Sequence, residues 1–299
     1  MASLKDYFLA TRPAFLITTL LACLIGLLST RELGATDPLI YLLTIALALL
    51  VHASANLLND YFDHLKGSDS INADRISPFT GGSRYIQNQI LTPRQVYGLG
   101  LSLLLIACVL GIYLCMQSTW ILMTIGLLGI VIAWAYSAPP LQLMSRGIFG
   151  EMAIALAWSL VVIGFATLQT RSVEVDSFPL AMSYGLMVSN ILFVNQIPDI
   201  RADRSAGKYT LAVQSSNKAL WIWYAAIVMS AYLFQFIAVL FSSVSPKTLL
   251  TLLLLPAFGK YAWQLHQAPL PKERLKTLIV RNMTSHQHQM LLQQELGNM

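Results

Sequence analysis

Long uninterrupted apolar runs are the feature that most constrains this chain. A helix needs about 20 mostly apolar residues to cross the hydrocarbon of a bilayer. Runs near that length lie at residues 14–30, 38–58, 96–115, 119–136, 149–169, 178–197, 218–242 and 247–265. Only 11% of the residues are charged, against roughly 25% in a soluble domain. The sequence therefore predicts an all-α, multi-pass transmembrane helical bundle of eight spans, with residues 1–299 forming one domain.

The last segment, residues 274–296, is more polar than the eight runs. A short apolar patch ends at Val280, and a stretch rich in Asn, Thr, Ser, His and Gln follows it. Such a segment is too polar to face lipid. It predicts either an amphipathic helix at the membrane surface or a ninth span hidden against the bundle.

The distribution of Lys and Arg predicts the orientation of the bundle. With the N-terminus inside, sixteen basic residues fall on the inner side, and only Arg31, Arg171 and Lys247 fall on the other. The positive-inside rule then predicts that this side faces the cytoplasm, and we expect the protein in the inner (cytoplasmic) membrane. Topology accounts for the basic residues, so the pI of 9.1 does not indicate a nucleic-acid partner.

Two acidic clusters stand at the ends of predicted spans on the cytoplasmic side. In each cluster an Asn and two Asp are spaced by three or four residues, which places them on one face of a helix. Mg²⁺ prefers oxygen ligands and commonly bridges carboxylates to substrate phosphates. Two such clusters predict a Mg²⁺ site facing the cytoplasm. The expected ligands are Asn56, Asp60, Asp63, Asp69, Asn195, Asp199 and Asp203.

Basic residues near the clusters are candidates for binding phosphate oxygens. Together with the Asn56 amide, these candidates are Arg12, Lys66, Arg75, Arg146 and Lys208. Acidic and basic groups at one membrane site predict a lipid diphosphate as substrate. The loop between Lys66 and Pro93, rich in turn-forming and charged residues, is expected to form an ordered lid.

Aromatic residues beside the clusters have two interpretations. The rings of Tyr61 and Tyr136 are placed to stabilise a carbocation through their faces, and they equally suit an interfacial aromatic belt. His52 lies about two turns before Asp60 on the same predicted helix. It is expected to be a buried, hydrogen-bonded residue and is given no role.

In these motifs the chain resembles the UbiA superfamily of intramembrane aromatic prenyltransferases. The resemblance runs from Arg12-Pro13 to about residue 265. It rests on Asn-Asp-Tyr-Phe-Asp at 59–63, Tyr-Ser-Ala-Pro-Pro at 136–140 and Asp-Ile-Arg-Ala-Asp-Arg-Ser-Ala-Gly-Lys-Tyr-Thr-Leu at 199–211. The continuation Asp-His-Leu-Lys-Gly-Ser-Asp at 63–69, followed by Asp74-Arg75, looks like the 1,4-dihydroxy-2-naphthoate branch of menaquinone synthesis. The chain lacks the Lys that the family usually carries after Tyr136, which leaves Gln142 and Arg146 as polar candidates there.

The resemblance implies a reaction and its catalytic residues. Asp60, Asp63, Asp199 and Asp203 would hold Mg²⁺ against the diphosphate of a polyprenyl donor. An aromatic acceptor, most like dihydroxynaphthoate, would attack C1 of the donor and lose its carboxylate. The product would leave through a lateral opening to the lipid bilayer.

Other functions remain open at the level of sequence. Within the same family the acceptor could be another quinone head group or a different aromatic compound. A different class of protein, an ion-coupled membrane transporter, would place its acidic residues near the bilayer midplane. A lipid-phosphate transferase would need one compact Asp motif, whereas Asp60 and Asp199 are far apart in this chain.

Overall fold

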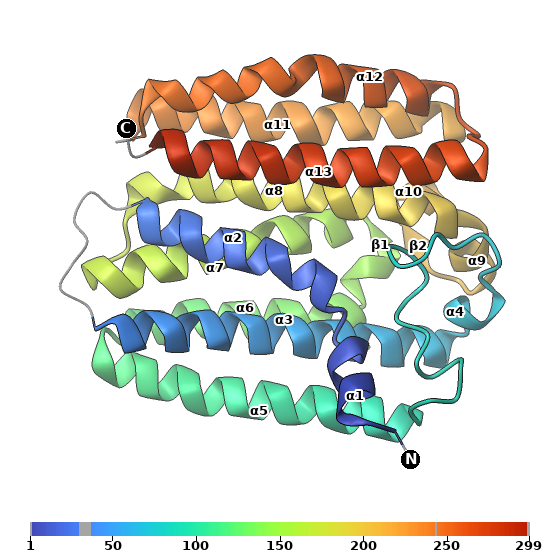
Figure 1. Ribbon diagram of the computed structural model, residues 1–299, viewed down its shortest axis with the longest axis horizontal. Helices are drawn as coiled ribbons and strands as arrows, with labels where there is room; N and C mark the ends of the chain where they lie inside the picture. The colour runs from blue at the N-terminus through green and yellow to red at the C-terminus, as the bar shows by residue number, and fades with distance from the viewer. Residues whose placement is uncertain (1, 30–36, 243, 298–299) are drawn as a thin grey trace.

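The computed structural model describes residues 2–29, 37–242 and 244–297 and consists almost entirely of helices (Figure 1). The α-helices are α1 Leu4–Ala10, α2 Pro13–Leu28, α3 Pro38–Lys66, α4 Ser68–Ile71, α5 Pro93–Gln117, α6 Ile121–Ser137, α7 Ile148–Thr170, α8 Phe178–Gln196, α9 Ile200–Ser205, α10 Leu211–Gln214, α11 Leu220–Phe241, α12 Leu255–His266 and α13 Lys272–Gly297. Short 3-10 segments lie at Leu143–Ser145, Val175–Ser177, Ile197–Asp199, Asn217–Ala219 and Pro246–Leu254. The strands β1 Arg146–Gly147 and β2 Tyr209–Thr210 pair in parallel.

The long helices run side by side along the length of the molecule (Figure 1). Helix α3 packs against α5, α7 against α8, and α8 against α11. Glycines permit the closest approaches: Gly26 of α2 lies against the backbone of Val162, and Gly185 of α8 lies against the carbonyl of Ala155. Small residues at such crossings are typical of helix packing in membranes, where close van der Waals contact replaces the hydrophobic effect.

Fewer helices than the eight predicted runs are long and apolar enough, by themselves, to cross a membrane. Within the described ranges, five helices are long and apolar enough to cross a bilayer. A sixth is reached if α1 and α2, which meet at an angle of 59°, count as one span. Helix α6 is apolar but shorter than these five helices. The run at 247–265 divides into the 3-10 segment Pro246–Leu254 and α12. Arg31 and the end of the first predicted run lie outside the described residues.

The polar C-terminal segment forms the long helix α13, which lies against α2, α8 and the 3-10 segment Pro246–Leu254 (Figure 1). Its polar side chains at 282, 286, 289 and 293 are buried. His286 pairs with Asn190 of α8 at 2.8 Å, and Asn282 accepts a hydrogen bond from Tyr224 of α11 at 2.8 Å. These contacts pack α13 against the bundle, and its placement as a ninth span or a surface helix stays a prediction.

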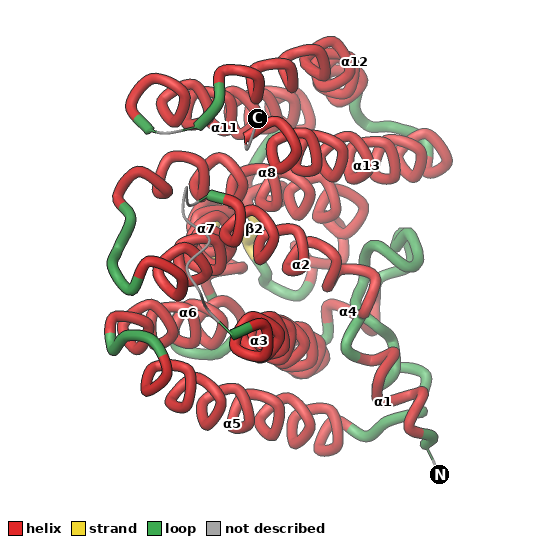
Figure 2. The backbone as a smooth tube through the Cα atoms, turned by 60° about the vertical axis from the view of Figure 1, so that its left-hand side comes forward, coloured by secondary structure: helices red, strands yellow, loops and turns green. Residues whose placement is uncertain are grey.

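One end of the bundle carries most of the non-helical backbone. The short elements α4, α9, α10, β1 and β2 lie together there, at the right in Figure 1. The loop after α4 packs on α1 through Ile86 and Leu91, and Figure 2 shows the two side by side. Both acidic motifs end at this side of the molecule.

Candidate active site

The first acidic motif lies on the last turns of α3. The helix continues to Lys66 and ends at Gly67, whose φ of +80° suits glycine. Asn56, Asp60 and Asp63 therefore share one helix, as their spacing predicts. Asp60 and Asp63 are 3% and 5% exposed. A carboxylate in such surroundings is costly without partners, which makes these residues candidates for function.

The second motif follows the end of α8. Pro198 lacks a backbone N–H and stands at a change in the chain from α-helix to a 3-10 turn. Asn195 thus belongs to α8, Asp199 to the 3-10 segment and Asp203 to α9. Asp203 is buried and Asp199 is half-buried.

Lys208 joins the two motifs. Its Nζ donates a 2.9 Å hydrogen bond to Oδ2 of Asp63 and lies 3.8 Å from Oδ1 of Asp203. Burial opposes the charge on this ammonium, but the carboxylates of Asp63 and Asp203 outweigh it and raise the pKa of Lys208 well above its ordinary value. Lys208 therefore carries a positive charge between the two motifs.

Residues 72–84, the part of the predicted lid that is called the lid loop from here on, lie against the same carboxylates. Asn72 Nδ2 and the backbone N–H of Gly81 donate to the two oxygens of Asp199 at 2.7 Å and 3.1 Å. The backbone N–H of Ser83 donates to Asp60 Oδ2 at 3.0 Å. Hydrogen bonds to both motifs order this loop over the site, as its composition predicts.

Gly82 of the lid loop approaches the cluster most closely. A Cβ at this position would lie 2.5 Å from Oδ2 of Asp69 and 3.1 Å from Oδ1 of Asp60. Its φ of +71° is also a conformation that favours glycine. Glycine is therefore required at 82 to leave space beside two carboxylates.

Arg12 reaches the site from the bend between α1 and α2. Its Nη1 lies 3.8 Å from Asp60 Oδ1, and its guanidinium lies over the ring of Phe15, 4.8 Å from the centroid. Its Nε is buried without a hydrogen-bond partner. A buried guanidinium with an unused donor is suited to binding an anion such as phosphate.

The site carries an excess of negative charge. Its five carboxylates form ion pairs with only two basic residues of the described chain, Arg12 and Lys208. Burial and the neighbouring carboxylates of Asp63 and Asp60 raise the pKa of Asp69. Further cationic charge would relieve this repulsion.

Two buried carboxylate oxygens without a hydrogen bond are candidate positions for a cation. Oδ1 of Asp60 and Oδ1 of Asp63 are buried without a hydrogen-bond partner. Across the described ranges, however, no three His, Cys, Asp or Glu side chains converge tightly enough to hold one ion. Oxygens of Asp63, Asp203 and Asp199 are in contact with Lys208 and Asn72 instead. These oxygen ligands suit Mg²⁺. On binding, the ion would replace some of the contacts that Lys208 and Asn72 make with the carboxylates.

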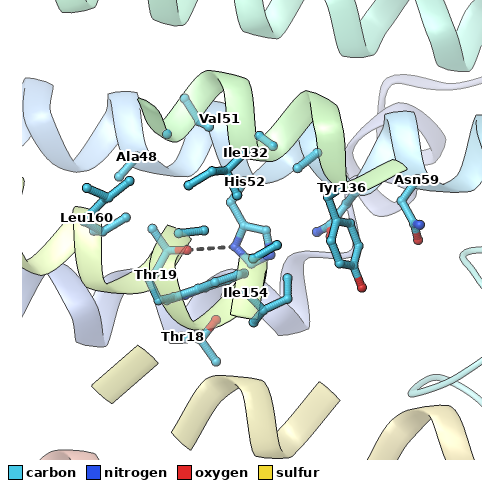
Figure 3. Close-up of a pocket in the computed structure, with 18 of the residues that line it drawn as sticks. Thr18, Thr19, Ala48, Val51, His52, Asn59, Ile132, Tyr136, Ile154 and Leu160 are labelled. Atoms are coloured by element: carbon cyan, nitrogen blue, oxygen red, sulfur yellow. Dashed lines mark hydrogen bonds between the residues drawn. The ribbon is translucent and has the colours of Figure 1, made fainter. Parts of the chain in front are cut away.

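A cavity of about 460 Å³ extends from the carboxylates into the bundle. Its polar end includes Asp63, Asp69, Asp199, Asp203 and Lys208. Its walls deeper in the bundle are mostly apolar, from α2, α3, α5, α6 and α7. Figure 3 shows the transition from Asn59 and Tyr136 to Val51, Ala48 and Leu160. This shape suits a ligand with a charged head and a long apolar tail.

Most of the sequence-predicted residues come together at the polar end. Besides the five residues just named, the cavity is lined by Arg12, Asn56, Tyr136 and Asn195. Asp60 borders this end through its contacts with Arg12 and Ser83.

Besides Asp60, four predicted residues do not line the cavity. Lys66 donates to Ser145 at 2.9 Å, and the stem of Arg75 lies against Gly81. Arg146 is exposed and bonds to the backbone carbonyls of Pro140 and Leu141. Tyr61 packs on Tyr97, with ring centroids 4.6 Å apart. These contacts give Arg146 and Tyr61 local structural roles.

Sequence reasoning missed the contacts of the lid loop. Asn72 donates a hydrogen bond to Asp199, 127 positions away, and no local spacing in the sequence predicts such a pair. Gly81-Gly82 was a visible signal, because adjacent glycines allow a backbone to approach other groups closely. Glu151 was also missed. Its buried carboxylate accepts a 2.9 Å hydrogen bond from Gln196, which lines the cavity.

The sequence matches a known protein family and several of its characterised members. The model of the UbiA prenyltransferase family matches residues 15–285. A 1,4-dihydroxy-2-naphthoate octaprenyltransferase of Bacillus subtilis is 29% identical over 248 residues, covering 82% of this chain and 77% of that protein. The UbiA prenyltransferase domain-containing protein 1 of Rattus norvegicus is 30% identical over 240 residues, covering 76% and 66%.

Solved structures share the fold. A structure of digeranylgeranylglyceryl phosphate synthase superposes with a TM-score of 0.68 at 16% identity, covering 99% of this chain and 98% of that one. A UbiA homologue from Archaeoglobus fulgidus, bound to DMAPP and Mg²⁺, gives a TM-score of 0.63 at 14% identity, covering 96% and 98%.

Proposed function

The chain belongs to the UbiA prenyltransferase family, and on that premise we propose that it transfers a polyprenyl group from a polyprenyl diphosphate to 1,4-dihydroxy-2-naphthoate. The observation that carries the proposal is the junction of Asp63, Asp203 and Lys208 at the mouth of a long apolar cavity. The naphthoate acceptor is supported by the names of several relatives at 27–29% identity. We also propose that the protein lies in the cytoplasmic membrane with this site facing the cytoplasm.

The polar end of the cavity binds the donor diphosphate. Arg12 and Lys208 supply positive groups for its oxygens. Asp60, Asp63, Asp69, Asp199 and Asp203 would hold Mg²⁺, which would supply when bound the charge that stabilises the leaving diphosphate. Oδ1 of Asp63 has no hydrogen bond and is a ligand position for it, as is Oδ1 of Asp60, which lies 3.8 Å from Arg12 without a hydrogen bond. A divalent metal is further supported by the Mg²⁺ found in a homologous structure.

The residues of the cavity then control the fate of the prenyl group. The bond between C1 and the diphosphate oxygen breaks, and its electron pair stays with the diphosphate. The apolar walls of α6 and α7 exclude water, which would otherwise capture C1. The face of Tyr136 is available to the developing positive charge. The ring carbon that bears the carboxylate bonds to C1, and the carboxylate leaves as CO₂, so that the electron pair of its bond to the ring restores the aromatic system.

The transporter interpretation receives no support. It requires acidic residues near the bilayer midplane, whereas these carboxylates lie where α3 and α8 end. Membership of a prenyltransferase family also favours chemistry over transport.

The test is product analysis by mass spectrometry. Membranes containing the protein receive Mg²⁺, a polyprenyl diphosphate and a panel of aromatic acceptors that includes dihydroxynaphthoate and 4-hydroxybenzoate. We expect a prenylated, decarboxylated naphthalene that disappears with EDTA. Preference for another acceptor would overturn the naphthoate assignment, and equal product in EDTA would overturn the metal. Membranes with Asp60→Asn, checked for equal insertion, serve as the inactive control.

A further inference from the structure

A stripe of four residues on α3 lines the cavity from its apolar depth to its acidic mouth. His52, Asn56, Asn59 and Asp63 are spaced by four, three and four residues, which places them on one helix face. At 1.5 Å per residue, His52 and Asp63 are roughly 16 Å apart along the helix. His52 is the innermost of the four and takes no part in the proposed diphosphate site.

His52 is held in one orientation by two neighbours. Its Nδ1 lies 2.7 Å from Oγ1 of Thr19 on α2, as Figure 3 shows. Its ring meets the ring of Trp158 on α7 edge-on, with centroids 4.9 Å apart. No hydrogen bond joins the second nitrogen, Nε2, to another residue of the described chain. The imidazole is thus fixed by one nitrogen, and the other remains available.

The surroundings of the imidazole make this available nitrogen significant. Ile132 and Ile154 lie beside the ring and offer no polar side-chain group, and the hydroxyl of Thr18 on the same wall donates to the carbonyl of Phe15. A polar nitrogen without a partner in a largely apolar cavity is costly, and a ligand with a matching polar group removes that cost. The prenyl tail contains no such group, so it gains nothing at this position. Tyr136 lies between His52 and Asn59 in the same view, with its hydroxyl directed away from α3.

We propose that Nε2 of His52 binds a ring hydroxyl of the aromatic acceptor and so determines which acceptors are used. The ring lies between His52 and the acidic mouth, where the roughly 16 Å of helix leaves room for C1 of the donor as well. A hydroxyl both donates and accepts, so it pairs with either tautomer of the imidazole. Thr19 is then a positioning residue that acts through His52. This inference rests on the proposed prenyl transfer.

The first test compares two substitutions of His52 that each place an amide group where one of the two ring nitrogens lies. Gln reaches the position of Nε2, whereas Asn is shorter and reaches only that of Nδ1. We expect H52N to raise the KM for the dihydroxy acceptor roughly tenfold or more, as expected for the loss of one hydrogen bond. We expect H52Q to stay within threefold of the wild type. The KM for the polyprenyl diphosphate should change less than threefold in both variants.

The decisive comparison uses acceptors that lack one hydroxyl or the other. The wild type should prefer the dihydroxy compound over one of the two monohydroxy analogues, and H52N should lose that preference. T19V keeps the shape of the threonine and leaves His52 in place, so it should reduce the same preference even if H52N fails to fold. Unchanged preference in both H52N and T19V would overturn the inference.

A binding measurement separates this inference from the proposed function. Trp158 contacts His52, so acceptor binding should quench tryptophan fluorescence in EDTA without any donor, and W158F should lose most of that signal. Weaker quenching in H52N than in H52Q supports the inference whether or not a prenylated product forms. Equal quenching in the two variants overturns it, even where the wild type makes the expected product.

Discussion

The ammonium of Lys208 lies 2.9 Å from Oδ2 of Asp63, a residue 145 positions earlier in the chain. This pair, extended to Asp203 at 3.8 Å, joins the end of α3 to the segment that follows α8. One lysine therefore links the two acidic motifs that the sequence pattern predicts to face each other.

Replacing Lys208 by Met should destabilise the protein and abolish its activity. The change leaves two buried carboxylates without their cation, and breaking a buried pair in this way costs about 3–5 kcal/mol. Thermal unfolding in detergent is the measurement, in EDTA and in Mg²⁺. We expect a lower midpoint in EDTA and partial recovery in Mg²⁺.

Lys218→Met is the matched control, because Lys218 is exposed and forms no ion pair in the described chain. Its unfolding midpoint should equal that of the wild type. A midpoint for Lys208→Met in EDTA equal to that of this control would contradict the bridging role of Lys208.

Gly82→Ala should reduce activity much more than Gly67→Ala. Both glycines have positive φ, +71° and +80°, so both substitutions carry a similar backbone cost of about 1 kcal/mol. Only at Gly82 does the new Cβ meet carboxylates, whereas nothing lies within 4 Å of a Cβ at Gly67. Prenyl transfer rates at saturating Mg²⁺ and the Mg²⁺ concentration for half-maximal activity distinguish the two variants. Equal rates in both would show that the space beside Asp69 is not needed.

Asp199→Asn should lower the prenyl transfer rate about 100-fold or more, the scale on which one electrostatic group at a reacting centre acts. The amide has the shape of the carboxylate but lacks the charge that would hold a metal. Asp74→Asn is the control, because Asp74 is half exposed and pairs with the exposed Arg201 at 3.0 Å. An exposed pair contributes little, so this variant should stay within twofold of the wild type. Full activity in Asp199→Asn would remove that residue from the proposed metal site.

Much of this architecture could be predicted from the sequence because the signals are local. Spacings of three and four residues placed Asn56, Asp60 and Asp63 on one helix face, and α3 confirms that they share a helix. Apolar length predicted a membrane bundle, but its eight runs do not correspond to eight long helices. It counts residues and takes no account of the 3-10 segment Pro246–Leu254 or the short helix α6.

The remainder depended on contacts between distant segments. The pairing of Asn72 with Asp199 and the orientation of His52 by Thr19 join different parts of the chain, so no periodicity reveals them. The prediction that Arg146 binds phosphate rested on its charge and on its place after the motif at Tyr136. In the folded chain its guanidinium donates to the nearby carbonyls of Pro140 and Leu141, a contact that charge and position do not reveal.

His286→Leu should destabilise the protein without changing its prenyl transfer rate at temperatures where the variant is folded. The substitution removes the 2.8 Å hydrogen bond to Oδ1 of Asn190 and leaves that oxygen buried, a loss of about 1–3 kcal/mol. It also removes the stacking of the imidazole on Phe258, whose centroid is 4.6 Å away. His288 is the matched control, because it lies on the same helix and is exposed. A helix lying on the membrane surface would respond to Leu at either position with unchanged or greater stability. A lower unfolding midpoint for His286→Leu alone would therefore establish α13 as a helix packed within the bundle.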